Sequence, residues 1–279
     1  DGWSATDGGS VVTFPFAHGQ TANFTLYAIW SANALTVTYD SKGGTSVTSG
    51  TVNTAASISS APTAPTRTGY TFSAWSATDG GTAITFPYAH GQTANFTLYA
   101  LWTADGNTVA FNNNSGSGTM TNQSIVSGTA TAITTNSFTR TGYTFAGWNT
   151  AANGSGTAYT NGQSVTITSA MTLYAQWTGT TNTITYDSKG GTSVSNGSFI
   201  TGGSISAAPT APTRAGYTLS GWSLTDGGSV ITYPNSPTAT SGITLYAIWA
   251  AVSCSPTSTT TGGYTIYTFT TAGTCFWTV

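Results

Sequence analysis

Hydrophobic and polar residues alternate strictly in several short stretches of the chain. Leu35, Val37 and Tyr39 alternate with polar neighbours, and the same alternation returns around Val109 and Ile184. A period of two is typical of a β-strand with one buried face. Each stretch is therefore predicted to be a half-buried strand, and the glycine pairs that follow the first and the last are predicted to form turns.

A second alternating stretch closes each unit of this pattern. Its best example places Phe96, Leu98, Ala100 and Trp102 on one face of a predicted strand. The tyrosines of this stretch fall on the opposite face. Between the two kinds of strand, the proline-rich residues 61–66 are predicted to be a crossover, because proline has no N–H for a β-ladder.

The pattern belongs to an internal repeat, which is the first feature to establish in any sequence. Residues 2–30 recur almost letter for letter as residues 74–102. Eight of the nine tryptophans occupy two repeat-equivalent positions, and successive members of each series are 72 to 75 residues apart. One series is Trp3, Trp75, Trp148 and Trp222; the other is Trp30, Trp102, Trp177 and Trp249.

The order of the copies predicts five segments. They are the second half of a repeat, three full repeats of about 72 residues with a divergent middle copy, and a C-terminal β tail: residues 1–31, 32–103, 104–179, 180–250 and 251–279. The linkers are too short to behave as flexible chains, so neighbouring repeats are expected to abut in a semi-rigid rod. We expect further residues before Asp1, and a Gly-rich domain that continues past Val279.

Composition narrows the class of protein. Only 4% of the 279 residues are charged, the net charge is −2, and Lys and Arg together number five. Nucleic-acid and anionic-membrane surfaces are built from many cations, so neither kind of partner is expected. The chain is 13% aromatic, which argues against disorder. It also lacks the run of about 18 apolar residues that a membrane helix needs, so no membrane insertion is expected.

Three recurring elements resemble a known family. They are V-T-Y-D-x-x-G-G-T, P-T-R-x-G-Y-x-F-x-G-W and T-L-Y-A-x-W, and they follow one another in each full copy. Over nearly all of residues 1–250 the chain resembles the Listeria–Bacteroides repeat, the B-repeat of internalin-like bacterial surface proteins. The resemblance implies a mainly β fold of small β-grasp-like units, an extracellular or cell-surface location and no enzymatic activity. The middle copy departs from the pattern, with Phe111 followed by three asparagines.

Most of the conspicuous side chains are predicted to be structural. The eight repeated tryptophans given above are predicted to form the core, because their period-two placement fits buried strand faces. The opposite-face tyrosines are a candidate contact surface for a glycan or another protein: Tyr27, Tyr99, Tyr174 and Tyr246. Cys254 and Cys275 could form one disulfide, which would fit an oxidising compartment.

Few residues indicate chemistry. Five aspartates at strand ends and in T-D-G-G sequences are predicted to form turns by bonding their own backbone two residues on: Asp7, Asp40, Asp79, Asp187 and Asp226. His18 and His90 occupy equivalent loop positions, and the later copies lack the histidine. A metal site would need further ligands, so none is expected. Phosphate-loop, dinucleotide-binding and nucleophile-elbow motifs are absent, and no catalytic residue or cofactor is predicted.

One arginine recurs in each full repeat, at Arg67, Arg140 and Arg214. Two interpretations stay open. The guanidinium could recognise a partner through its planar fork, or it could stack on a ring or bond carbonyls within its own repeat.

These observations favour a non-enzymatic extracellular repeat protein, forming a stalk or array on a bacterial surface and contacting copies of itself or neighbouring surface proteins. One alternative is a self-assembling filament, in which a neighbouring subunit supplies missing strands. The other is an adhesin that binds a glycan or a host receptor.

Overall fold

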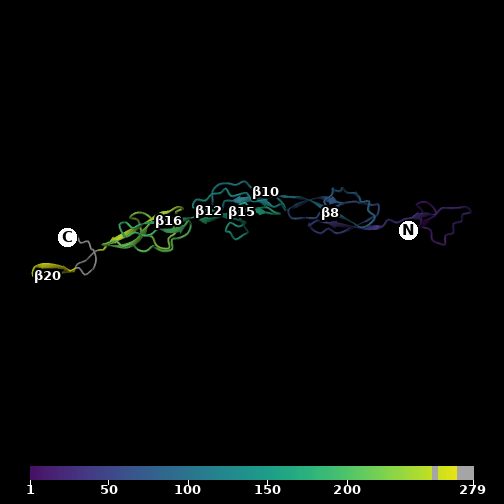
Figure 1. Cartoon of the computed structure of the whole chain (residues 1–279). Helices are drawn as coiled ribbons and strands as arrows, with labels where there is room; N and C mark the ends of the chain where they lie inside the picture. The colour runs from purple at the N-terminus through teal and green to yellow at the C-terminus, as the bar shows by residue number, and fades with distance from the viewer. Residues whose placement is uncertain (253–256, 269–279) are drawn as a thin grey trace. The chain divides into compact units, whose positions relative to one another are not determined.

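The computed structural model describes residues 1–252 and 257–268 (Figure 1). These residues form strands and loops and no helix, so the fold is mainly β. Packing divides the chain into two compact units, each described by itself. Unit 1 comprises Asp1–Thr108, Ser124–Thr131 and Ser164–Ala170, and unit 2 comprises Val109–Gln123, Ala132–Gln163 and Met171–Val279.

The full repeat in unit 1 is built on a mixed four-stranded sheet. Its strands are β3 (Ala34–Asp40), β4 (Gly50–Asn53), β6 (Tyr70–Ser76) and β8 (Phe96–Ala104), in the order β4-β3-β8-β6. The two central strands, β3 and β8, are parallel, and each edge strand is antiparallel to its neighbour. A separate small sheet pairs β5 (Ser57–Ile58) with β7 (Tyr88–Ala89). The proline-rich residues 61–66 form no strand.

The last full repeat, in unit 2, has the same sheet. Its strands are β16 (Thr181–Asp187), β17 (Gly197–Ile200), β18 (Tyr217–Ser223) and β19 (Ile243–Ala251), in the order β17-β16-β19-β18. Ile184 pairs with Ile243 in the parallel centre, as Val37 pairs with Phe96 in the earlier copy. The β-grasp assignment itself stays a prediction.

The divergent repeat adds one strand to this plan. Its main sheet has the order β10-β9-β15-β12-β13. These strands are β9 (Gly106–Asn112), β10 (Gln123–Val126), β12 (Tyr143–Asn149), β13 (Ala158–Tyr159) and β15 (Met171–Gly179). A second sheet joins β11 (Thr131–Ala132) to β14 (Ser164–Val165).

Two short pieces lie at the ends of the described chain. Residues 1–31 hold only the antiparallel pair β1 (Gly2–Ser4) and β2 (Tyr27–Ile29). In the tail, β20 (Thr257–Thr261) and β21 (Tyr264–Thr268) form a hairpin. The predicted disulfide partners, Cys254 and Cys275, lie outside the described residues.

The core of each full repeat is centred on one tryptophan. Trp75, Trp148 and Trp222 are each 1% exposed. A ring of the first strand meets each of them at 5.0–5.1 Å between centroids: Tyr39, Phe111 and Tyr186. Within residues 1–252 and 257–268, the three buried indole N–H groups have no hydrogen-bond acceptor.

The tryptophans of the second series lie at the rim of the core. Trp102 and Trp249 are partly buried and pack against the buried cluster of their own repeat. Trp177 is also partly buried and contacts Phe145 at 5.7 Å between ring centroids.

Two tryptophans do not lie in a core, which corrects the prediction for them. Trp3 is 48% exposed and Trp30 is 83% exposed. In the first full repeat Tyr39 of β3 packs against the Trp75 ring, and Phe72 of β6 packs against the Trp102 ring. The sheet of residues 1–31 contains only β1 and β2, so no equivalent of β3 lies over these two rings.

Replacing the central tryptophan should therefore have a much larger effect than replacing its exposed equivalent. We expect Trp75→Ala to cost about 3–5 kcal/mol, the usual result of emptying an aromatic core site. This corresponds to amide exchange in β8 that is at least ~100-fold faster. Hydrogen exchange read by mass spectrometry resolves it repeat by repeat. Trp3→Ala is the matched control, and an equal effect of the two changes on their own repeats would contradict this account of the core.

Candidate functional site

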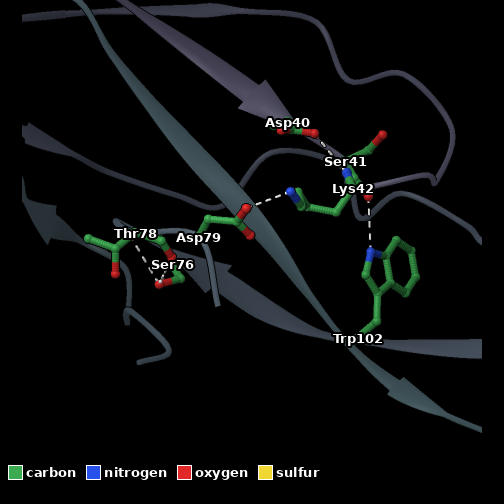
Figure 2. A network of polar contacts seen from close by, with 7 residues as sticks. All are labelled: Asp40, Ser41, Lys42, Ser76, Thr78, Asp79 and Trp102. Carbon is green, nitrogen blue, oxygen red and sulfur yellow. Dashed lines mark hydrogen bonds and ion pairs between the residues drawn. The ribbon is translucent and has the colours of Figure 1, made fainter. Parts of the chain in front are cut away.

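A tight turn follows the first strand of each full repeat, and a tryptophan closes it. In the first full copy the turn spans Ser41 to Gly44, and the Gly44 N–H donates to the Ser41 carbonyl at 3.1 Å. The Trp102 indole N–H donates to the same carbonyl at 2.9 Å (Figure 2). A Cβ atom on Gly44 would lie 2.6 Å from the Trp102 ring, so glycine is needed there.

The same clamp recurs in the other two full repeats. Trp177 donates to the Asn113 carbonyl and Trp249 donates to the Ser188 carbonyl, each at 2.9 Å. A Cβ atom on the equivalent glycines would again meet the tryptophan ring, at 2.8 Å for Gly116 and 2.6 Å for Gly191. The turn and the tryptophan therefore form one structural unit in every full copy.

Aspartate side chains do two different things around this turn. Asp40 accepts a hydrogen bond from the Lys42 backbone N–H at 2.8 Å, two residues on, as predicted for a turn-forming aspartate. Asp79 differs from the prediction, because its carboxylate pairs with the Lys42 ammonium at 2.6 Å (Figure 2). In the T-D-G-G turn the buried Ser76 hydroxyl donates instead to the Thr78 carbonyl at 2.8 Å.

The last full repeat copies this arrangement, and the divergent repeat replaces it with neutral groups. Lys189 pairs with Asp226 at 2.7 Å. At the equivalent position Asn114 donates through its amide to two carbonyls, those of Ala152 at 2.8 Å and Ala175 at 2.9 Å. An uncharged amide thus ties the same turn to the same neighbouring loop.

Three of the four candidate contact tyrosines are less exposed to solvent than was expected from their position on the outer face of the strand. The Lys42 ammonium lies 5.9 Å from the centre of the Tyr99 ring, and Lys189 lies 5.8 Å from the Tyr246 ring. Both rings, and that of Tyr174, are half-buried. Tyr27 is 40% exposed. A role of these rings in partner contact stays a prediction.

The arginine of each full repeat stacks on a tyrosine three residues later. The guanidinium carbon lies 3.9 Å from the Tyr70 ring centre for Arg67, 3.9 Å from Tyr143 for Arg140, and 4.0 Å from Tyr217 for Arg214. The stacking interpretation is thus confirmed, and it fixes the plane of each guanidinium without using its N–H groups.

Consecutive repeats are joined by hydrogen bonds at their linkers. In unit 1 the Asp105 N–H donates to the Gly69 carbonyl at 2.9 Å, and the Asp105 carbonyl accepts from the Ser127 N–H at 2.9 Å. The Thr71 hydroxyl donates to the Asp105 carboxylate at 2.7 Å. The Tyr70 hydroxyl reaches the Ser127 carbonyl at 3.5 Å. A single linker residue is therefore bonded to both repeats.

The next linker, inside unit 2, repeats the arrangement with different side chains. The Thr180 N–H donates to the Gly142 carbonyl at 2.9 Å, and its carbonyl accepts from the Thr201 N–H at 3.0 Å. A Cβ atom on Gly202 would lie 2.5 Å from the Tyr143 hydroxyl. Short linkers between abutting repeats were predicted from the sequence, but these hydrogen bonds were not. The signal for them is the Gly-Tyr pair that follows each arginine, together with the glycines at 128 and 202.

The histidines organise loops. His90 is buried, stacks on Phe96 at 4.9 Å, and accepts at Nδ1 from the Gln92 N–H at 3.0 Å. His18 bonds the Gln20 N–H in the same way. Among residues 1–252 and 257–268, no group of three or more His, Cys, Asp or Glu side chains is placed to hold a metal ion. No helix in this part of the chain is long and apolar enough to cross a membrane.

Known proteins match this chain in the region of its three full repeats. The Listeria–Bacteroides repeat domain model matches residues 36–101, 108–176 and 183–248, which together cover more than two thirds of the chain. A predicted membrane protein of Evansella cellulosilytica is 27% identical over 226 residues, covering 81% of this chain and 33% of that protein. Internalin H of Listeria monocytogenes is 35% identical over 108 residues, covering 38% and 19%.

A Gly-rich membrane protein, also predicted in Evansella cellulosilytica, is 28% identical over 194 residues, covering 69% of this chain and 22% of that protein. The chain thus spans a third or less of the length of these relatives.

Filling the glycine beneath the tryptophan should break the clamp. We expect Gly44→Ala to push Trp102 off the Ser41 carbonyl and to cost about 1–3 kcal/mol, as overpacking does. Urea unfolding can be followed with a dye on a cysteine replacing Ser73, after Cys254 and Cys275 are changed to serine. Gly50→Ala is the control, because its Cβ would meet Tyr39 at an ordinary 3.6 Å. Equal losses in the two variants would refute the clamp.

Alkaline pH should weaken two of the three full repeats. Burial raises the pKa of the Tyr39 and Tyr186 hydroxyls, and the hydrogen bond to Asp79 or Asp226 raises the pKa of the Lys42 and Lys189 ammonium groups. A raised folded-state pKa gives stability that is complete below the unfolded value and is lost as pH rises through the folded value. The window therefore opens above pH ~10, where tyrosine and lysine ionise in unfolded chains.

The divergent repeat is the internal control for this loss, because it has Phe111 and Asn114 at those positions. Urea midpoints should fall between pH 9 and 11.5 for dyes at Ser73 and Ser220, and should fall less for a dye at Ala146. Tyr39→Phe should flatten the slope at Ser73 alone. A uniform fall at all three dyes would show that these groups do not set the pH dependence.

Proposed function

The chain belongs to the Listeria–Bacteroides repeat domain family, and on that premise we propose that it is a non-enzymatic structural protein of a bacterial surface. Its repeats act as spacers in a stalk or array. The partners expected for this function are neighbouring surface proteins or further copies of the chain. The family match to three tandem repeats and the membrane and internalin names of the relatives support a surface repeat protein.

The observation that carries the spacer function is the bonded linker. A spacer must transmit its length, so its joints must resist bending. At the joints that follow the first two full repeats, one residue donates to the preceding repeat and accepts from the following one, as Asp105 and Thr180 do. A free Gly/Ser linker would leave these backbone groups to water and behave as a random coil.

A tyrosine adds side-chain packing to each joint. Tyr70 and Tyr143 are held by their stacked arginines, and their hydroxyls lie against glycines of the following repeat. A wide ring fixed on one repeat and seated on the next opposes rotation about the linker. Removal of the ring should therefore loosen the joint without unfolding either repeat.

Distance measurements between spin labels test the spacer function. Ala146 and Ser220 are equivalent, exposed strand positions of consecutive repeats, so a nitroxide on each reports the joint between them. The parent should give one narrow distance distribution. Tyr143→Ala should broaden it at least twofold, whereas the control Tyr174→Ala, which removes a ring from the same repeat away from the joint, should not.

A broad distribution in the parent would overturn the spacer function, because the joints would then be flexible. A Tyr143→Ala variant as narrow as the parent would show that the ring does not stiffen the joint. Unchanged urea midpoints for dyes on each repeat confirm that the variants are folded.

A further inference from the structure

Among the lysine and arginine side chains of the described residues, the three arginines are those that form no ion pair. Lys42 and Lys189 are each paired with an aspartate. The guanidinium groups of Arg67, Arg140 and Arg214 stack on tyrosines, and within residues 1–252 and 257–268 no side chain or carbonyl accepts a hydrogen bond from them. A guanidinium carries five N–H donors. Each repeat therefore presents a fixed, half-buried cation with unused donors.

The arginine of the first full repeat lies in a groove lined by aromatic rings. In the first full repeat the groove has a volume of about 600 Å³ and is lined by Arg67, Tyr70, Phe72, Trp102 and the Gly43–Gly44 turn. That volume lies in the range of small-molecule sites. The lining contains no aspartate, so nothing in the groove neutralises the arginine. The Trp102 N–H is already bonded to Ser41, which fixes the ring in place.

Residues that line this groove recur in the other two full repeats. In the last repeat Arg214 stacks on Tyr217 and lies 6.0 Å from the centre of the Trp249 ring. The Gly190 turn sits beneath it, since a Cβ atom there would lie 3.6 Å from the Arg214 Nε. The divergent repeat keeps Arg140 and Trp177, although its turn has lost the charged pair. The arginine and the tryptophan are therefore retained in the repeat that lacks the lysine–aspartate pair.

We propose that these grooves bind acidic polysaccharide, one uronate residue to each groove. The planar guanidinium fork matches a carboxylate with two parallel hydrogen bonds. The tryptophan and tyrosine rings supply the apolar surface on which a sugar ring can pack. A cation held by stacking needs no further ordering when the carboxylate arrives, which favours binding.

Three weak sites in one chain give strength through multivalency. A polymer bound in one groove meets the next at a raised effective concentration, so total affinity exceeds that of any single site. If the sites bound independently, removing two of the three would lower the apparent affinity for the polymer only about threefold. Because the sites act together, the loss should be much larger. This inference stands apart from the spacer function, because a flexible array of grooves would also bind the polymer.

The test uses the full chain and immobilised alginate, a polymer of uronates, at physiological salt. The double variant Arg67→Gln/Arg140→Gln should bind at least tenfold more weakly than the parent. Lys42→Gln/Lys189→Gln is the control with the same net charge and should stay within twofold of the parent. Tryptophan fluorescence should change when soluble alginate oligosaccharide is added to the parent, and this change should shrink in the arginine variant.

Three outcomes would overturn the proposal: no binding of alginate by the parent, equal losses in the arginine and lysine variants, or unchanged binding in the arginine variant. Dextran tests whether sugar stacking alone suffices, and equal binding of dextran would remove the carboxylate from the proposal. Polyphosphate tests whether the grooves select a carboxylate or a phosphate group. Tighter binding of polyphosphate than of alginate would show that the ligand is a phosphate polymer and not a uronate polymer. Urea midpoints for dyes on each repeat verify that every variant is folded.

Discussion

The parallel pairing of the first and last strands is the constraint on which each full repeat depends. Val37 pairs with Phe96, and Asp40 pairs with Tyr99. A parallel pair needs a long crossover between its strands, and nearly everything else in the repeat is that crossover. Because the two strands run the same way, the chain enters the sheet at one end and leaves it at the other. This geometry allows the last strand of one full repeat to be connected to the first strand of the next by a single residue, Asp105 or Thr180.

The central tryptophan and the clamped turn both follow from that pairing. The parallel strands bring Tyr39 and Leu98 to one face, where Trp75 from the antiparallel strand β6 packs against them. At the other end of the pair, the turn after β3 comes beside the last residues of β8, where Trp102 bonds it. Each full repeat is thus stabilised at its centre by a buried tryptophan and at its edge by the hydrogen bond from a second tryptophan to the turn.

Much of this fold could be predicted from the sequence, because strict repetition and alternation reveal strands and their buried faces. The burial of Trp75, Trp148 and Trp222 was predicted, but strict alternation along β6 would place Trp75 on the exposed face of Thr71 and Ser73. A register shift between Phe72 and Ala74 moves it to the buried face, and the other two copies have the same shift. The exposure of Trp3 and Trp30 was not predicted, since it depends on which strands lie over them. The Lys42–Asp79 pair joins turns 37 residues apart, and no local pattern specifies such a contact. The arginine stacking was one of two interpretations that sequence left open, and only the observed distances decided between them.

The scarcity of charge has a consequence for where this fold can work. The described residues contain two ion pairs, both partly exposed, and the divergent repeat uses the neutral Asn114 amide at the same turn. Dissolved salt screens attractions between exposed charges and has little effect on hydrogen bonds between neutral groups. The free energy of unfolding is therefore expected to be nearly the same in fresh water and in brine. A surface protein built in this way can keep its folded structure, without changes to its sequence, when the salinity of its surroundings changes.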